Sequence, residues 1–369
     1  MNDKRSLTKT FSLFVLIIII LNACAAAGTV PSTDQSANAG QAANGEQAVR
    51  YEQEQNYNIL RGILRMNHNF RGTTENKNIK LQFDYSNENL SVLRTKYGLD
   101  AIAGTGGDLS KSLNILFWLC EHVCHNGDYD NHIPMNSLDL LEYAYDKNTE
   151  QALNCLNLSF ILAECLLSIG VPARSVGIFP FSPYDADNHV VTHVYIADID
   201  KWIMLDPTWC AYFKDADGNI LDAVELRDFL AEGREVFLNK EYAYNGDKLI
   251  ANSASVWDYK RYLAKDLFYF IIFENSSFGR ENYGRALSVC PAGFSLFESE
   301  MYRMEYNIEF IKTYKGASEE MRQSYIESAT AQLEEMRKSA AAHDENAMEK
   351  GYFYLSLEDF LARPDLKNE

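Results

Sequence analysis

The fold is decided by residues 154–174, which read NCLNLSFILAECLLSIGVPAR, and by residues 189–208, which read HVVTHVYIADIDKWIMLDPT. In the first segment apolar side chains recur at steps of three and four residues, and this spacing predicts a helix that starts near Cys155 and runs to Ile169. Gly170, followed by a Val-Pro pair, is typical of a helix end. The first segment therefore predicts one helix whose first turn carries a cysteine.

The second segment predicts an antiparallel pair of strands. Residues 189–197 and 202–205 are rich in β-branched and aromatic side chains and flank a turn at residues 198–201. Residues 174–179 form another strand candidate between the helix and this pair. A helix followed by antiparallel strands predicts an α+β domain.

Periodicity predicts further elements on both sides of this core, and we find no internal repeat. Additional helices are expected at residues 110–125, 137–146, 223–231, 257–270 and 318–342. Additional strands are expected at residues 79–85 and 352–357.

The N-terminus predicts export. Three cationic residues precede the apolar run Phe11–Leu21, which is shorter than the roughly 20 residues of a membrane-spanning helix but fits a signal peptide. The run ends in Leu-Asn-Ala-Cys24, which resembles a bacterial lipobox, where the cysteine is diacylated after cleavage. We therefore expect a lipoprotein signal peptide at residues 1–23, and a protein held outside the cytoplasm at the bacterial cell membrane by lipid on Cys24. The alternative is an ordinary signal peptide cleaved near Ala27.

Composition divides the rest of the chain. Residues 24–49 are rich in Ser, Gln, Asn, Gly and Ala, and we expect a flexible tether there because such a segment cannot bury a core. We expect a large folded domain with an N-terminal extension at residues 50–275, and a helical C-terminal extension at residues 276–369.

The charge of the chain limits its partners. The formal net charge is −18, and removal of residues 1–23, which carry a net charge of +2, gives about −20. Such acidity argues against nucleic acid as a partner and against non-specific binding to anionic surfaces. Acidity alone does not identify a substrate, and the oligomeric state stays open.

Cysteine spacing predicts neither a disulfide framework nor a metal site. Apart from Cys24 and Cys155, an odd number of cysteines remains, without regular spacing. Residues 120–125 read CEHVCH, but the two cysteines lie on the apolar stripe of the predicted helix and no second pair follows at finger-like spacing. Residues 215–219 hint at a calcium loop, but the glycine is at the wrong offset and no closing glutamate follows. We expect no metal and no cofactor.

One set of residues has the chemical groups of a catalytic site. Cys155 lies at the start of its predicted helix, where unpaired N–H groups and the helix dipole favour a thiolate. A thiolate nucleophile needs a base, and the base needs an orienting acceptor. His189 and Asp206 follow 34 and 51 residues later, at the start of one predicted strand and the end of the next. Each residue alone is more often structural, but their order and spacing suggest a triad.

These residues belong to four motifs: Asn154-Cys155, Leu-Leu-Ser-Ile-Gly-Val-Pro-Ala-Arg at 166–174, His189-Val-Val, and Lys-Trp-Ile-Met-Leu-Asp-Pro-Thr at 201–208. Together they resemble a transglutaminase-like domain, with a motif core at 154–209 and weaker similarity from about 90 to 275. The resemblance implies a papain-like cysteine-enzyme fold, in which the catalytic cysteine at a helix N-terminus packs on an antiparallel sheet that carries histidine and aspartate. It implies Cys155, His189 and Asp206 as that triad.

Two histidines of the same predicted strand, His189 and His193, are candidates for the base of the triad. His189 and His193 face the same side of one strand, about 13 Å apart, so both cannot face Cys155. An ideal hairpin closed over residues 198–201 would set His193 opposite Asp206, whereas the family has its histidine at the position of His189. We favour His189 and expect a bulge or longer loop to correct the register, with His193 as the alternative base.

The predicted oxyanion site consists of backbone N–H groups at the helix start, including that of Cys155. Whether Asn154 or Trp118 contributes is left open.

The expected function follows from this site and from the N-terminus. We expect a membrane-anchored extracytoplasmic cysteine enzyme that acts on peptide or carboxamide bonds of a protein or peptide substrate. The triad does not separate hydrolysis from transfer to an amine, although hydrolysis is favoured slightly for an isolated bacterial domain. The alternative is a non-catalytic surface lipoprotein that uses the same cleft to bind peptide or glycan.

Overall fold

The computed structural model describes residues 39–369, except residues 75–78, 186, 248–252, 314–317, 345–347, 349 and 368–369. The predicted signal peptide, Cys24 and the first part of the predicted tether lie outside this range. None of the helices in the described ranges is both long enough and apolar enough to cross a membrane.

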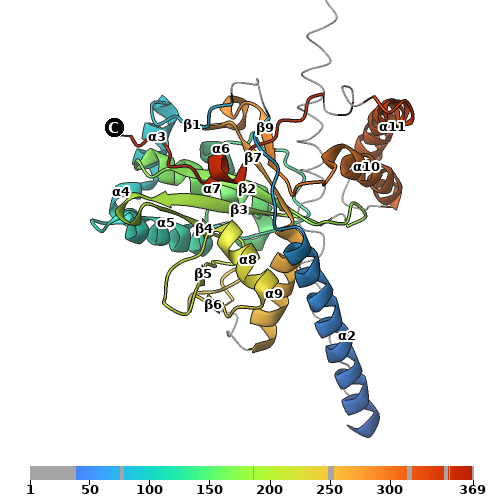
Figure 1. The fold of residues 1–369 in the computed structure, drawn as a ribbon. Helices are drawn as coiled ribbons and strands as arrows, with labels where there is room; N and C mark the ends of the chain where they lie inside the picture. Colours follow the sequence, from blue (N-terminus) through green and yellow to red (C-terminus); the bar gives the residue numbers. More distant parts are fainter. Residues whose placement is uncertain are drawn as a thin grey trace, which may run out of the picture.

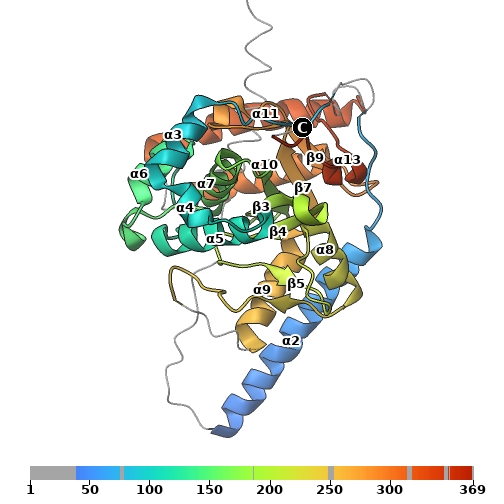
Figure 2. The same ribbon diagram turned by 90° about the vertical axis from the view of Figure 1, so that its left-hand side faces the viewer.

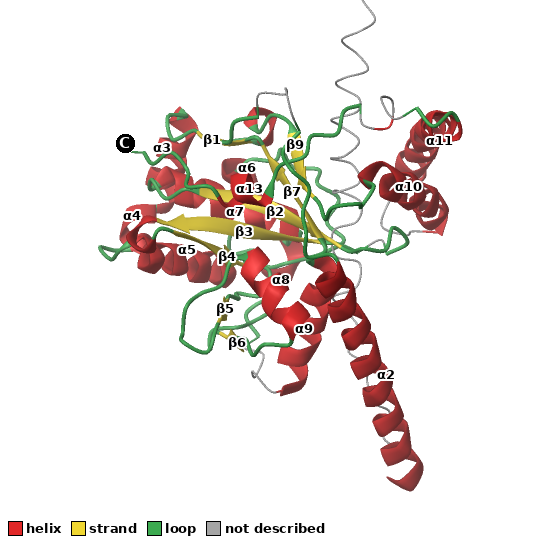
Figure 3. Cartoon of the chain, viewed as in Figure 1, coloured by secondary structure: helices red, strands yellow, loops and turns green. Residues whose placement is uncertain are grey.

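A five-stranded antiparallel sheet forms the centre of the fold, in the order β4-β3-β2-β7-β9 (Figures 1 and 3). The strands are β2 (Ala173–Phe179), β3 (His189–Ile196), β4 (Lys201–Leu205), β7 (Tyr269–Phe273) and β9 (Ala286–Val289). Helices cover this sheet, so the structure has the mixed α and β architecture that the sequence predicts, consistent with a transglutaminase-like fold.

The helix that the first motif predicts is α7 (Cys155–Ser168), which packs on β2 and β3. Every residue of α7 is buried, because further helices surround it on the side away from the sheet (Figure 2). These helices are α3 (Glu88–Tyr97), α4 (Leu99–Ala103), α5 (Asp108–His122) and α6 (Ser137–Ala144). A hydrophobic cluster joins this layer to the sheet through Leu158 and Leu162 of α7 and Val194 of β3.

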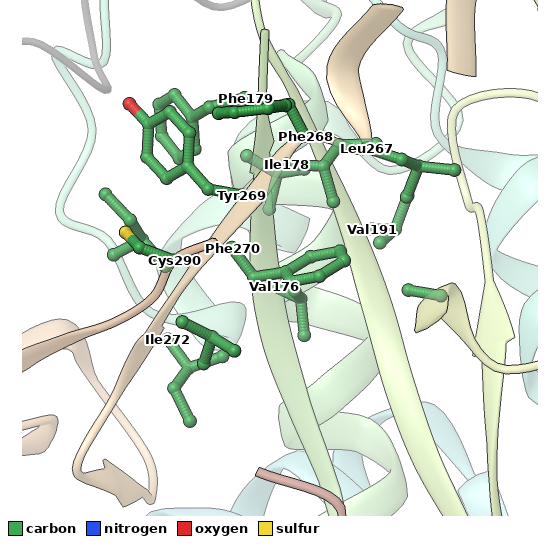
Figure 4. Packing of buried hydrophobic residues seen from close by; sticks show 14 of the residues in the cluster. Val176, Ile178, Phe179, Val191, Leu267, Phe268, Tyr269, Phe270, Ile272 and Cys290 are labelled. Atoms are coloured by element: carbon green, nitrogen blue, oxygen red, sulfur yellow. The ribbon is translucent and has the colours of Figure 1, made fainter. Parts of the chain in front are cut away.

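A second layer of helices packs beside β2 and β3. It contains α2 (Ala39–Met66), α8 (Ala223–Glu232) and α9 (Ser253–Asp266), which contact one another. Figure 4 shows the core beneath, where Val176 and Ile178 of β2 lie near Phe270 and Ile272 of β7. The capping box of Asp222 and Glu225 starts α8, and Gly233 with φ +76° ends it.

The remaining elements are short or lie at the edge of the fold. Two-stranded sheets pair β1 (Gln82–Phe83) with β8 (Asn275–Ser276), and β5 (Phe213–Lys214) with β6 (Phe237–Leu238). Short 3-10 helices occupy Asn148–Gln151, Ala197–Ile199 and Arg280–Asn282. The helices α10 (Leu296–Thr313) and α11 (Glu319–Ala341) pack on each other, and α13 (Leu357–Leu361) follows near the C-terminus.

The hairpin departs by two residues from the ideal register, and neither the expected bulge nor a longer loop is the cause. β3 and β4 pair Ile196 with Lys201 and His193 with Met204, so His193 is not opposite Asp206. The reason is the turn, which occupies residues 197–200 and closes one residue earlier than expected. It contains a 3-10 turn, and Asp200 closes it with a left-handed φ of +50°.

The predicted boundary at residue 275 does not divide the structure. β9 lies beyond that boundary and is a strand of the central sheet, and Tyr354 bridges to Ser288 in β9. The segment that follows β7 is therefore partly a component of the same core. The sequence does not predict that β9 belongs to the core, because a short buried strand shows neither helical nor alternating periodicity.

Three local predictions also differ from the structure. Helix α9 ends at Asp266 rather than Phe270, because the apolar run after it is strand β7. Residues 352–357 contain an isolated bridge at Tyr354 rather than a strand. The expected flexible tether is helical from Ala39 onward, since α2 extends into a segment with several alanines.

Candidate active site

Cys155 is the first residue of α7, and its side chain is fully buried. The preceding residue, Asn154, is the N-cap, and its side-chain oxygen accepts a hydrogen bond from the N–H of Asn157 at 3.1 Å. This cap satisfies one of the unpaired N–H groups of the first turn. The cysteine therefore lies where the helix dipole is positive, as the sequence predicts.

A network of three asparagines holds the start of the helix against the loop before it. The amides of Asn154 and Asn157 both donate to the Oδ1 of Asn131, at 3.1 Å and 2.6 Å. Asn131 has a left-handed φ of +56°, which asparagine tolerates better than most residues. Asn154 is thus occupied as a cap and linker, whereas Trp118 packs among Tyr97 and Tyr145.

His189 and Asp206 meet at the end of the sheet. His189 is the first residue of β3, and Asp206 follows the last residue of β4. The Nε2 of His189 lies 2.6 Å from the Oδ2 of Asp206, and both side chains have 0% exposure. The two-residue change of register makes this contact possible, because the last pair of the two strands is Thr192 with Leu205 and Asp206 follows directly, on the side where β3 begins with His189.

Contacts between α7 and β3 bring the cysteine to this end of the sheet. Ser159, one turn after Cys155, donates to the carbonyl oxygen of Val191 at 2.8 Å, and its Oγ is 2.9 Å from the Oγ1 of Thr192. Val191 is two residues after His189. The start of α7 therefore lies beside the start of β3.

Asp206 is held as a carboxylate by several donors. Besides His189, the hydroxyl of Tyr259 donates to Oδ2 at 2.6 Å and the N–H of Thr208 donates to Oδ1 at 2.9 Å. Burial by itself raises the pKa of Asp206, but the charge of His189 and these hydrogen bonds lower it below its ordinary value. The phenol of Tyr259 stays protonated, since burial and then Asp206 raise its pKa well above 10.0.

Aromatic side chains enclose this pair. The ring of Tyr259 packs against Trp209 and Tyr242, with centroid distances of 5.4 Å and 5.6 Å. The ring of Tyr262 contacts His189 edge-on, at 5.6 Å. Tyr259 and Tyr262 both come from α9, so this helix covers the His189–Asp206 pair.

His193, the alternative base, lies in a different environment. Its Nε2 accepts a hydrogen bond from the N–H of Ala223 at 3.1 Å, and its ring packs against Trp202 and Phe360. Burial and then the charge of Arg174 lower the pKa of His193 well below 6.5. The imidazole of His193 therefore stays neutral, with Nε2 bonded to a backbone N–H.

The side chains of the 120–125 segment point to separate partners. Cys120 donates to the carbonyl oxygen of Pro207 at 3.3 Å, His122 bonds to Asp146, and His125 bonds to Tyr244. Within the described residues, no group of three or more His, Cys, Asp or Glu side chains is arranged to hold a metal ion. In the 215–219 segment, the side chain of Asp215 accepts from backbone N–H groups of its own turn.

Sequence reasoning missed Tyr259, Tyr262 and Asn131. None of them belongs to the motifs at 154–174 and 189–208, and the two tyrosines come from a helix about fifty residues further along the chain. The hydroxyl groups of the two tyrosines do not identify a partner, and Asn131 lies in a loop without periodicity.

Comparison with known proteins agrees with the geometry. The transglutaminase-like superfamily matches residues 101–207, which include Cys155, His189 and Asp206. No significant match was found among curated proteins or among solved structures. Residues 101–207 are therefore a transglutaminase-like superfamily domain.

Proposed function

We propose that the protein is a cysteine enzyme that transfers acyl groups from peptide or carboxamide bonds, with Cys155 as nucleophile, His189 as base and Asp206 as the residue that orients His189. The observation that carries the proposal is the 2.6 Å contact between His189 Nε2 and Asp206 Oδ2. Because Asp206 is ionised, it accepts the Nε2–H. That tautomer leaves Nδ1 as the nitrogen that takes the thiol proton.

The reaction follows from these roles. The Cys155 thiolate attacks the substrate carbonyl carbon, and the resulting oxyanion accepts hydrogen bonds from N–H groups at the start of α7. The His189 imidazolium gives its proton to the departing amine or ammonia, which leaves a thioester on Cys155. Water or a second amine then attacks the thioester, His189 takes the proton of this nucleophile, and the thiol is regenerated.

The proposed location comes from the N-terminal sequence. The lipobox-like sequence ending at Cys24 supports export and attachment to the cell membrane through lipid. Metabolic labelling with an alkyne fatty acid tests this. We expect label on the wild-type protein and none on Cys24→Ala, and equal labelling of both would overturn the anchor.

A turnover experiment tests the enzyme. Purified wild type, Cys155→Ala and Cys165→Ala are incubated with glutamine-containing peptides, with and without a fluorescent primary amine. Cys165 is a matched control, because it is a buried cysteine of the same helix. We expect ammonia release, peptide cleavage or amine incorporation with wild type and Cys165→Ala alone.

The complete burial of the three proposed residues favours a second candidate, a non-catalytic surface lipoprotein that binds peptide or glycan. A buried nucleophile reaches a substrate only if a covering element moves. No turnover by wild type, together with ligand affinity that Cys155→Ala leaves unchanged, would favour this candidate over the enzyme.

A further inference from the structure

His125 lies beside the start of α7, although it belongs to the segment that follows α5. Its backbone forms a parallel bridge with Leu153. The N–H of Leu153 donates to the carbonyl oxygen of Cys124 at 3.0 Å, and the N–H of Asn126 donates to that of Leu153 at 2.7 Å. Paired backbones lie about 5 Å apart, and Cys155 is two residues after Leu153. The bridge therefore holds His125 close to the proposed nucleophile.

The imidazole ring of His125 contacts the aromatic side chains that enclose the His189–Asp206 pair. Its Nδ1 is 3.0 Å from the hydroxyl oxygen of Tyr244, and the Tyr244 ring packs on Trp209 at a centroid distance of 4.8 Å. Trp209 in turn packs on Tyr259, whose hydroxyl donates to the buried carboxylate. Backbone pairing and ring contacts thus place His125 beside the site from two directions.

The second ring nitrogen of His125 is a buried polar atom without a partner. The side chain is 4% exposed, and within the described parts of the chain no group forms a hydrogen bond with its Nε2. Such an atom is rare in a folded protein and calls for an explanation, of which a catalytic role is one. The side chain of Asn154, by contrast, is already bonded to Asn131 and to Asn157.

We propose that His125 is a further catalytic residue, which donates a hydrogen bond from Nε2 to the carbonyl oxygen of the substrate. The inference rests on the proposed function, in which Cys155 attacks that carbonyl group. When the hydroxyl of Tyr244 donates to Nδ1, the hydrogen of the ring is on Nε2, which is then a donor. A side-chain donor thereby joins the backbone N–H groups at the start of α7.

The donor acts on the charge that develops during acylation. The sulfur of Cys155 bonds to the carbonyl carbon, and the π electron pair of the carbonyl moves onto its oxygen. His125 stabilises this oxyanion through the Nε2–H and keeps its own proton. The pair then returns, the C–N bond breaks, and the amine or ammonia leaves with the proton that His189 supplies.

Two replacements that differ by one methylene group test this role. The amide of glutamine reaches the position of Nε2, whereas the amide of asparagine reaches only that of Nδ1. We expect His125→Asn to lower kcat for a glutamine-containing peptide about 100-fold or more, with little change in KM, and His125→Gln to recover most of this loss. His122→Asn, in the same segment and bonded to Asp146, is the control and keeps the wild-type rate.

The rate of Cys155 alkylation by iodoacetamide separates this role from that of His189. Alkylation needs the thiolate but forms no oxyanion, so His125→Asn is expected to be alkylated at the wild-type rate while its turnover falls. Slow alkylation of His125→Asn would overturn the proposal, because His125 would then act on the thiol or on the fold.

Turnover separates failure of this inference from failure of the proposed function. Active wild type with an equally active His125→Asn, or with His125→Gln no faster than His125→Asn, would overturn the inference alone. An inactive wild type would remove the proposed function, and the role of His125 with it.

Discussion

At the scale of single residues, Tyr259 shows how the core supplies a component of the site that the motifs do not contain. Its hydroxyl and the imidazole of His189 both bond to the same oxygen of Asp206. Hydrogen bonds to a charged group contribute about 1.5–3 kcal/mol each. Tyr259 therefore acts on His189 through Asp206, as a positioning residue.

Replacement of Tyr259 by Phe tests this role. With one donor lost, the pKa of Asp206 rises, and we expect the acid limb of the pH profile for Cys155-dependent turnover to move to higher pH. Because the folded-state pKa of Asp206 is lowered in wild type, its stabilisation is present above the unfolded pKa and lost as pH falls through the folded pKa. The variant should lose about 1–3 kcal/mol of unfolding free energy at pH 7.

Tyr242→Phe is the control for this variant, since the Tyr242 ring stacks on Tyr259. It is expected to leave the acid limb in place. An unchanged pH profile in Tyr259→Phe, measured together with Tyr242→Phe, would contradict the positioning role.

Glu164 is a buried carboxylate in the middle of α7, where it accepts hydrogen bonds from the N–H groups of Ser137 and Gly279 and from Tyr283. Burial raises its pKa to about 7, more than these donors lower it. For an acid whose folded-state pKa is raised, the unfolded chain loses its proton first. Stability therefore falls as pH rises from about 4.5 to about 7, by about 3 kcal/mol at most.

We expect Glu164→Gln to flatten this part of the stability profile, measured by urea unfolding between pH 5 and pH 7.5. Glu300 has a pKa of about 7 for the same reason, so a smaller slope remains. The exposed Glu334→Gln is the control. A slope in Glu164→Gln equal to that of wild type would refute the assignment.

At the scale of elements, the start of α7 depends on asparagines that link its first turn to the loop containing Asn131. Asn154 caps the helix, and Asn131 accepts from both Asn154 and Asn157. Loss of an N-cap costs about 0.5–2 kcal/mol.

Asn154→Ala removes the cap and the link to Asn131 together, and should lower the unfolding free energy by about 2 kcal/mol or more. Asn154→Ser restores the cap alone and should recover part of the loss. Urea unfolding of both variants measures this, and equal stability of the two would show that the cap does not contribute.

Elements with a local signal were predicted well from the sequence. The period of α7 and the Gly-Val-Pro that follows predict its range to within one residue, and β2 and β3 are similarly close. The first two residues of strand β7 fall within the helix predicted at residues 257–270, because a fully buried strand is apolar at every position and has no period. β9 has only four residues, and Ser288 interrupts its apolar run, so the sequence carries no pattern that predicts it.

The candidate site was predictable only in part, for a related reason. Cys155, His189 and Asp206 belong to motifs with a recognisable order. The register that joins His189 to Asp206 depends on the left-handed Asp200 in the turn, which no spacing rule reveals. Tyr259 depends on how α9 packs, which is a tertiary property.

At the scale of the whole molecule, the C-terminal segment completes the core rather than extending it. The guanidinium of Arg174, in the Gly-Val-Pro-Ala-Arg motif, lies between the rings of Trp202 and Phe360 and donates to the Phe360 carbonyl. Trp202 also donates to the carbonyl of Ala362 at 3.1 Å. Residues about 190 positions apart thus form one packed unit over β3 (Figure 1).

Phe360→Ala tests whether this segment belongs to the core. It removes a fully buried ring, and we expect a loss of about 3–5 kcal/mol of unfolding free energy by urea denaturation. Phe237, which is exposed, gives the matched control Phe237→Ala with little effect. A small loss for Phe360→Ala would mean that the segment is a separate appendage.

The most direct test of the proposed triad is the rate of Cys155 alkylation by iodoacetamide at pH 6, followed by peptide mass spectrometry in wild type, His189→Asn and His193→Asn. If His189 holds the proton of Cys155, His189→Asn should react about tenfold or more slowly, because an unassisted thiol with a pKa of about 8.5 is mostly protonated at pH 6. His193→Asn should react at the wild-type rate. Equal rates in wild type and His189→Asn, or slow reaction in His193→Asn alone, would contradict the account.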